Sequence, residues 1–276
     1  MSIISLASPE GPSFKLLGVA FDTKLMMVEA VATLCNEAAW KLRNLLRTQR
    51  FFDTKNMIHL FKSKILGYIE YRTAAIYHAP ATALHQLDRI YHQLLRAAGI
   101  SKEDALLYFG LAPLKARRDV AILGIIHRTI LGLGPGHFRR FFRLAPAPQN
   151  PAGRVALHAH SYQLQSYRIG KYLDVAAHSL LGAVDVYNAL PEYVVAAESV
   201  KEFQNRLQQM LKIGAREHHM DWDTMLSNRH LMFRHPLLKF SGFTGLKSHG
   251  TPASVQEKRN ENASAACVKG WLNMRD

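Results

Sequence analysis

The feature of this sequence that most constrains its fold is the spacing of its apolar residues, which recur at steps of three and four along residues 26–131. An α-helix turns by about 100° per residue, so residues at this spacing lie on one stripe of its surface. The pattern therefore predicts a long amphipathic helix that begins near Met26. The apolar stripe of this helix consists of Val31, Leu34, Cys35, Ala38, Leu42, Leu45 and Leu46.

Three more helices are predicted in the same part of the chain. The second covers about residues 53–77, with Asp53 or Thr54 as its N-cap. The third bears Leu84, Leu87, Tyr91 and Leu94 and ends at Gly99. The fourth covers about residues 114–131 and is followed by two glycines and a proline at positions 134–136, which break helices.

The remaining segments complete a mainly α-helical prediction. We expect a short β element in residues 1–25, a helical bundle in 26–144, a Pro-rich linker at 145–153, a smaller C-terminal helical unit in 154–240 and a disordered tail over 241–276. Within the C-terminal unit, helices are predicted around 160–181 and 199–213. Ser199 and Glu202 have the spacing of a capping box at the start of the second of these helices.

The charge balance points to an anionic partner. The chain of 276 residues has 35 Lys and Arg against 21 Asp and Glu, a net charge of +14, and more of this excess lies in residues 1–140. Such a surplus favours nucleic acid first, with an anionic membrane surface or no specific partner as the alternatives. No apolar run is long enough for a membrane span. The two cysteines are too few for a disulfide framework, so we expect an intracellular protein, cytoplasmic or nuclear.

The sequence offers no recognisable catalytic or metal site. It lacks a G-x-S-x-G motif, a P-loop and any pair of adjacent aspartates that would hold the two metal ions of a polymerase. His218 and His219 are adjacent, so on a helix they diverge, and the segment with His158 and His160 offers no third ligand. We therefore expect no catalytic residue and no bound metal in this chain.

Positive charge on helix faces is the remaining functional signal. Arg43, Arg47 and Arg50 are four and three residues apart, so they share one side of the first helix with Trp40. Such a row can follow a phosphate backbone, and an aromatic ring can stack on a base. A solvated helix face without a ligand explains the same spacing equally well.

Two further arginine groups are candidate contacts. Arg117 and Arg118 open the fourth helix, where the helix dipole disfavours cations, so they indicate either an anionic partner or a buried carboxylate. Arg139 and Arg140 belong to the densest basic and aromatic cluster, which an amphipathic helix that buries its phenylalanines would also explain.

Three segments, in this order, resemble motifs of one protein family. They are FKLLGVAFD at 14–22, ILGYIEY at 65–71 and DVYNALP at 185–191, the last followed by the Ser-Val-Lys-Glu-Phe of 199–203. They resemble the primer grip, thumb and closing segment of reverse transcriptases from non-LTR, LINE-type retrotransposons. Three positions depart from the family pattern: Leu16 stands for Tyr, Gly67 for Pro and Tyr187 for Trp.

The resemblance implies a function as part of an RNA-directed DNA polymerase. Lys15, Leu17 and Gly18 would correspond to the primer grip, and the helices would hold an RNA or DNA template-primer duplex. The metal-binding aspartates of the family lie in a palm that this sequence does not contain, so Mg²⁺ and catalysis are expected only with a palm-containing partner. The alternative is a helical scaffold protein derived from such an element, without nucleic-acid binding.

Overall fold

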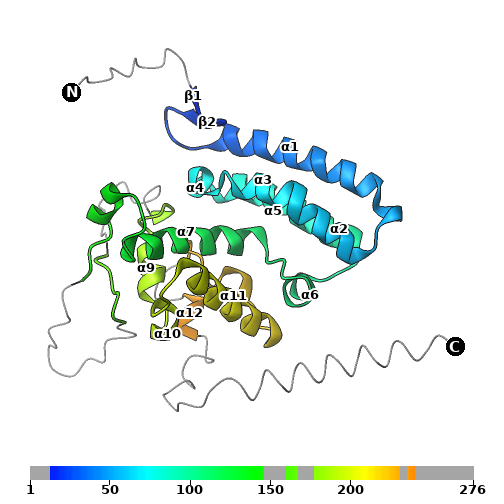
Figure 1. Cartoon of the computed structure of the whole chain (residues 1–276). Coiled ribbons are helices and arrows are strands. Elements are labelled where there is room, and N and C mark those ends of the chain that lie inside the picture. The colour runs from blue at the N-terminus through cyan, green and yellow to red at the C-terminus, as the bar shows by residue number, and fades with distance from the viewer. Residues whose placement is uncertain (1–12, 146–159, 167–176, 231–234, 240–276) are drawn as a thin grey trace. The chain divides into compact units, whose positions relative to one another are not determined.

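The computed structural model describes residues 13–145, 160–166, 177–230 and 235–239. This part of the chain is mainly helical and begins with a two-stranded antiparallel hairpin, as predicted (Figure 1). Residues 1–240 form one compact unit. The predicted tail at 241–276 lies outside the described residues.

The hairpin consists of β1 (Ser13–Leu16) and β2 (Val19–Asp22). Leu16 pairs with Val19, so Leu17 and Gly18 alone form the turn, and both have positive φ angles. This is the backbone of a type I′ turn, which continues the right-handed twist of the strands and favours glycine. The hairpin ends at Asp22, whose carboxylate accepts the backbone N–H groups of Met26 and Met27 just before the first long helix.

Helices α1 (Val28–Arg47) and α5 (Ala81–Ala98) form the main packing pair (Figure 1). They run in the same direction. Near their starts, His78 Nε2 lies 2.8 Å from the Leu25 carbonyl oxygen, and at their ends Gln49 Nε2 donates to the Ala97 carbonyl oxygen. The predicted apolar stripe of α1 faces this interface, where Leu34, Leu42 and Leu87 are fully buried.

The return path between α1 and α5 is built from short helical pieces. Asp53 caps α2 (Thr54–Phe61), because its carboxylate accepts the N–H of Asn56 at 2.7 Å. A π-helical segment (Lys62–Leu66), α3 (Gly67–Glu70) and α4 (Thr73–Ile76) follow. The predicted helix over 53–77 is therefore present but interrupted, with a π turn that widens the spacing of its side chains.

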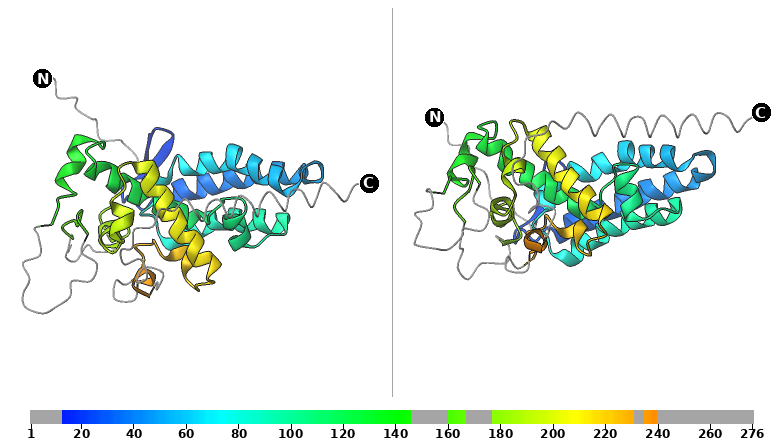
Figure 2. Two further views of the ribbon diagram at one scale, coloured as in Figure 1. Left: turned by 60° about the horizontal axis from the view of Figure 1, so that its bottom comes forward. Right: turned by 90° about the horizontal axis from the view of Figure 1, so that it is seen from below.

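Helix α7 (Leu114–Ile130) is the middle layer of the unit. One side of it packs against α4 and α5, and the other side against α9 (Ala183–Asn188) and α11 (Val200–Arg216), as Figures 1 and 2 show. The short α-helices α6 (Lys102–Leu107), α10 (Glu192–Val195) and α12 (Pro236–Lys239) lie around these elements, and 3₁₀ helices cover Gln49–Phe51, Gly136–Arg140 and Trp222–Thr224.

Of the two helices predicted in the C-terminal unit, one is confirmed and the other is wrong in part. α11 confirms the prediction at 199–213, and the Ser199 hydroxyl accepts the Glu202 N–H as a capping box requires. The predicted helix at 160–181 is wrong for 160–166, which are irregular and form a bridge between Leu164 and Leu144. Most of the predicted linker lies outside the described residues, so the division at 145–153 stays a prediction, although α7 contacts helices from both sides of it.

The interface between α1 and α5 generates the first testable prediction. Replacing the fully buried Leu87 by alanine removes apolar contacts and leaves a cavity, so the free energy of unfolding should fall by about 2–5 kcal/mol. Urea unfolding followed by circular dichroism measures this loss. The neighbouring exposed residue provides the control: Gln86→Ala should change stability by less than about 0.5 kcal/mol. Equal losses in both variants would contradict this packing.

Candidate nucleic-acid interface and the buried polar cluster

The outward side of α1 carries the predicted arginine row. Arg43, Arg47 and Arg50 are all exposed, and Trp40, one turn before Arg43, is 59% exposed. The Arg50 guanidinium lies over the ring of Phe51, which is also exposed. Within the part of the chain that the structure describes, none of the three arginines forms an ion pair with a carboxylate. The predicted helix side is confirmed for Trp40, Arg43 and Arg47, whereas α1 ends at Arg47 and Arg50 lies in the short 3₁₀ helix (Gln49–Phe51) that follows. We call these four side chains, Trp40, Arg43, Arg47 and Arg50, the basic face of α1.

The second predicted row, Arg117 and Arg118, has an internal role. Arg117 pairs with Glu70 of α3, and Arg118, which is only 6% exposed, pairs with Asp88 of α5 with its Nη1 2.9 Å from Oδ1. Of the two explanations for arginines at this helix start, the structure favours the carboxylate. A side chain as buried as that of Arg118 does not reach a phosphate, so the two arginine rows do not form one surface.

The third predicted group lies after α7, in a short 3₁₀ helix (Gly136–Arg140). Arg139 and Arg140 are exposed here, whereas the neighbouring Phe142 is buried. The Arg139 guanidinium donates to the Gly132 carbonyl oxygen, and that of Arg140 lies over the ring of Phe141. The arginines point outward and Phe142 points inward, which agrees with the alternative of an amphipathic segment that buries a phenylalanine.

The hairpin places the residues compared with a primer grip at its tip. Leu17 and Gly18 form the turn, Lys15 precedes it on β1, and all three are exposed. The hairpin and the chain that follows it also expose large apolar side chains, namely Phe14, Leu16, Leu17, Leu25, Met26 and Val28.

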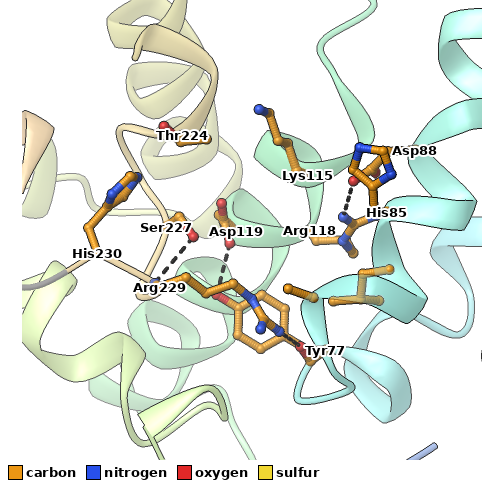
Figure 3. A pocket seen from close by; sticks show the side chains of 12 residues that line it. Tyr77, His85, Asp88, Lys115, Arg118, Asp119, Thr224, Ser227, Arg229 and His230 are labelled. Carbon is orange, nitrogen blue, oxygen red and sulfur yellow. Dashed lines mark hydrogen bonds and ion pairs between the residues drawn. The ribbon is translucent and has the colours of Figure 1, made fainter. Parts of the chain in front are cut away.

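A cavity of about 230 Å³ lies between α5, α7 and residues 224–230 (Figure 3). Asp119, which is 5% exposed, contributes its carboxyl group to the lining, and Arg118 lies beside it in α7. Arg229 from the C-terminal segment donates to the carbonyl oxygens of Tyr77 and Ala79, 2.9 Å away in each case. These contacts hold residues 224–230 against the start of α5.

The hydrogen-bond partners around Asp119 accommodate a proton on its carboxyl group. The Tyr77 hydroxyl oxygen lies 2.8 Å from Asp119 Oδ1 and 3.3 Å from Asn228 Oδ1. Both amide hydrogens of Asn228 are donated to the carbonyl oxygens of Ala177 and Ser179, so Asn228 presents an acceptor to Tyr77. The single hydroxyl hydrogen of Tyr77 cannot serve two acceptors. A proton on Asp119 supplies the second hydrogen, giving a chain in which Asp119 donates to Tyr77 and Tyr77 donates to Asn228.

The electrostatic surroundings agree with this count. Burial raises the pKa of Asp119 to about 7, although the Tyr77 hydroxyl and the guanidinium groups of Arg118 and Arg229 act in the opposite direction. Burial also raises the pKa of Tyr77, so its hydroxyl keeps its hydrogen. Sequence reasoning missed this cluster, because Tyr77, Asp119 and Asn228 come from three distant segments.

On the other side of α7, His127 is fully buried. Its Nδ1 lies 3.0 Å from the Tyr187 hydroxyl and its Nε2 3.0 Å from the Ala197 carbonyl oxygen, while its ring stacks on Phe203. Burial lowers the pKa of this histidine. The DVYNALP segment thus packs its Tyr187 into the core.

The histidines considered as metal ligands lie apart. His160 Nε2 lies 3.0 Å from the Tyr187 carbonyl oxygen, and His219 Nε2 lies 3.0 Å from Glu217 Oε2. His158 lies outside the described residues. Within the described ranges, no three His, Cys, Asp or Glu side chains gather as metal ligands, and no helix is both long and apolar enough to cross a bilayer.

The protonated Asp119 generates the second testable prediction. Its pKa in the folded chain lies above the ordinary 3.8, so the folded state binds more protons between these values and loses stability as the pH rises toward and through 7. In the Asp119→Asn variant, the side-chain amide would donate to Tyr77 without titrating. Between pH 5 and pH 8, the stability of this variant relative to the wild type should rise by about 2–3 kcal/mol.

Urea midpoints across this pH range measure the effect, and the difference between the two proteins isolates it. The buried His127, His160 and His235, whose pKa values are lowered by burial, act in both proteins and destabilise them as the pH falls. Asp221→Asn, at an exposed aspartate, is the control and should follow the wild type. Parallel profiles for Asp119→Asn and the wild type would show that Asp119 is ionised in the folded chain.

Comparison of the chain with protein-family models, with curated proteins and with solved structures finds no match. The likeness to LINE-type reverse transcriptases therefore remains one of sequence motifs. The function has to be argued from the surfaces described above.

Proposed function

We propose that this chain binds nucleic-acid duplexes through their phosphates, as part of an RNA-directed DNA polymerase whose catalytic palm lies elsewhere. The observation that carries the proposal is the basic face of α1, where three exposed arginines have no carboxylate partners among the described residues. Two of them lie on α1 beside an exposed tryptophan, and the third lies in the 3₁₀ helix that follows. In this function the chain positions a duplex and neutralises its charge, which requires neither a catalytic group nor a metal of its own.

The dimensions of the row suit a phosphate backbone. Arg47 lies four positions after Arg43, which corresponds to roughly 6 Å along α1, and Arg50 follows three positions later in the 3₁₀ helix. Phosphates of one strand follow one another at about 3.4 Å along the duplex axis, so the row faces about three of them. Arginine also binds phosphate oxygens through two parallel N–H groups, which lysine cannot do.

The distribution of carboxylates strengthens the field at this face. Glu70 and Asp88 pair with Arg117 and Arg118, and Asp223 accepts contacts from Lys102 and Lys115. These three carboxylates are thus engaged with cations beside α7 and are not available to pair with the arginines of the basic face.

The hairpin supplies the observation behind the alternative function. Its exposed apolar side chains, with those of Leu25, Met26 and Val28, fit contact with another protein, and the inward pairing of Arg117 and Arg118 reduces the basic surface. A scaffold protein without nucleic-acid binding would use this patch alone. In the proposed function the same patch is a contact for the palm-containing part of the polymerase.

The third prediction tests the basic face directly. The wild type should bind a blunt 20-base-pair duplex with a log K that falls with log salt at a slope of about −0.9 per phosphate contact. Replacing Arg43, Arg47 and Arg50 together by glutamine should reduce the magnitude of this slope by up to about three contacts, because three cations are lost. Fluorescence anisotropy at several salt concentrations measures the slope.

A charge-matched triple variant is the control for this experiment. Arg89, Lys201 and Arg216 are exposed on α5 and α11, and their replacement by glutamine removes the same formal charge from other helices. This variant should keep nearly the whole slope. If the wild type does not bind at 50 mM salt, the scaffold function replaces the proposed one. Equal slopes for the two triple variants would move the binding surface away from α1.

A further inference from the structure

A groove of about 390 Å³ lies beside α2, where the turn after α6 approaches that helix. One wall comes from the first turns of α2 and from the π-helical segment, and the other from residues 108–109. The lining residues are Lys55, Asn56, Ile58, His59, Lys62, Tyr108 and Phe109. None of these seven residues carries a carboxylate.

The basic side chains of the groove share one helix side. Lys55, His59 and Lys62 are four and three residues apart, the same spacing as the arginines of α1. Lys55 and His59 are exposed. Lys62 has a structural role, because its ammonium group donates to the Phe109 carbonyl oxygen and so holds the opposite wall of the groove in place.

The opposite wall presents an aromatic ring to solvent. Tyr108 is 78% exposed, although a tyrosine of a folded helical unit ordinarily covers part of its ring against neighbours. The base of the groove includes Ile58, which is 2% exposed and belongs to the core. A ring that stands beside cations over an apolar floor has the properties of a stacking platform for a nucleobase.

The groove follows the basic face of α1 along the chain. Residues 48–53 join α1 to α2 and include the 3₁₀ helix with Arg50, and Lys55 is the second residue of α2. Asp53 is the acidic residue in this connection, and its carboxylate is engaged as the N-cap of α2. The chain therefore leads from the arginines to the groove without an unengaged carboxylate between Arg50 and Lys55.

We infer that this groove binds one unpaired nucleotide at the end of a duplex, with its base stacked on Tyr108 and its phosphate between Lys55 and His59. The inference rests on the proposed function and extends it, since it names a duplex with a single-stranded end as the ligand. A cavity of this volume lies within the range of sites for small ligands. The Asn56 side chain lies at the same groove and provides an amide for the edge of a base.

The fourth prediction compares a blunt duplex with the same duplex carrying one extra adenosine nucleotide at a strand end. Stacking of a base on an aromatic side chain contributes about 1–3 kcal/mol, so the overhang should tighten binding by about tenfold. Both strand ends are tested separately with the full chain. Placing 2-aminopurine at the overhang should give a fluorescence decrease on binding, since stacking on Tyr108 quenches it.

Variants at Tyr108 separate stacking from charge. Tyr108→Ala should remove the gain from the overhang and leave binding of the blunt duplex unchanged, whereas Tyr108→Phe should keep the gain. Tyr71→Ala is the matched control, because Tyr71 is 66% exposed but does not line the groove. Thermal unfolding checks that the variants are folded, and the exposure of Tyr108 makes a loss of core packing negligible.

The outcomes distinguish this inference from the proposed function. If the blunt duplex binds and neither overhang adds affinity, the groove does not bind a nucleotide, and the proposed binding of duplexes is supported. If only the overhang duplex binds, and Tyr108→Ala abolishes this, the groove is confirmed and the basic face of α1 is not a duplex site. If Tyr108→Ala retains the gain, the unpaired base binds elsewhere, and if neither duplex binds, both ideas are wrong.

Discussion

The burial of α7 on both sides is the constraint on which the described structure depends. This helix lies between α4 and α5 on one side and α9 and α11 on the other (Figure 2). It nevertheless carries Arg118, Asp119 and His127, all of them buried. An unpaired polar group in such a place costs several kcal/mol, so the neighbouring helices have to provide partners. Asp88, Tyr77 and Tyr187 do so, and the positions of α5, α4 and α9 relative to α7 follow from these pairs.

The sequence predicted the long helices well, because periodicity and capping are local properties. The stripe of α1, the N-cap Asp53, the glycine after α5 with its φ of 65° and the capping box of α11 all lie where the pattern placed them. The π turn inside 53–77 was not predicted, since the apolar residues before and after it keep the three- and four-residue steps of an unbroken helix. Residues 160–166 are irregular because Asn188 binds both backbone groups of Leu164, a contact across 24 residues.

The candidate sites also divide into local patterns, which the sequence predicts, and contacts between distant residues, which it does not. Arg43 and Arg47 could be placed on one exposed side of α1 from their spacing, since the opposite side of the same helix was visibly apolar. Arg50 is exposed as well, but it lies beyond the end of α1, which the spacing did not predict. Arg117 and Arg118 are likewise arginines on a predicted helix, but they pair with carboxylates that lie 47 and 30 residues away in the chain. A signal was present in Asp88, which falls one residue after the buried Leu87 and four after Leu84 of the third predicted helix. A carboxylate beside a buried stripe has to find a cation, and the start of α7 supplies one.

The pairing beside α7 also fixes the position of the helix that carries most of the basic face. The polar contacts between Arg118 and Asp88, and between Lys115 and Asp223, stabilise the packing of α7. Because α1 rests on α5, and α5 is tied to α7 through Asp88, the arginines project from a helix whose position is fixed through these contacts. A phosphate ligand would then meet a row of guanidinium groups whose helical support is already ordered, which reduces the entropy that binding has to overcome.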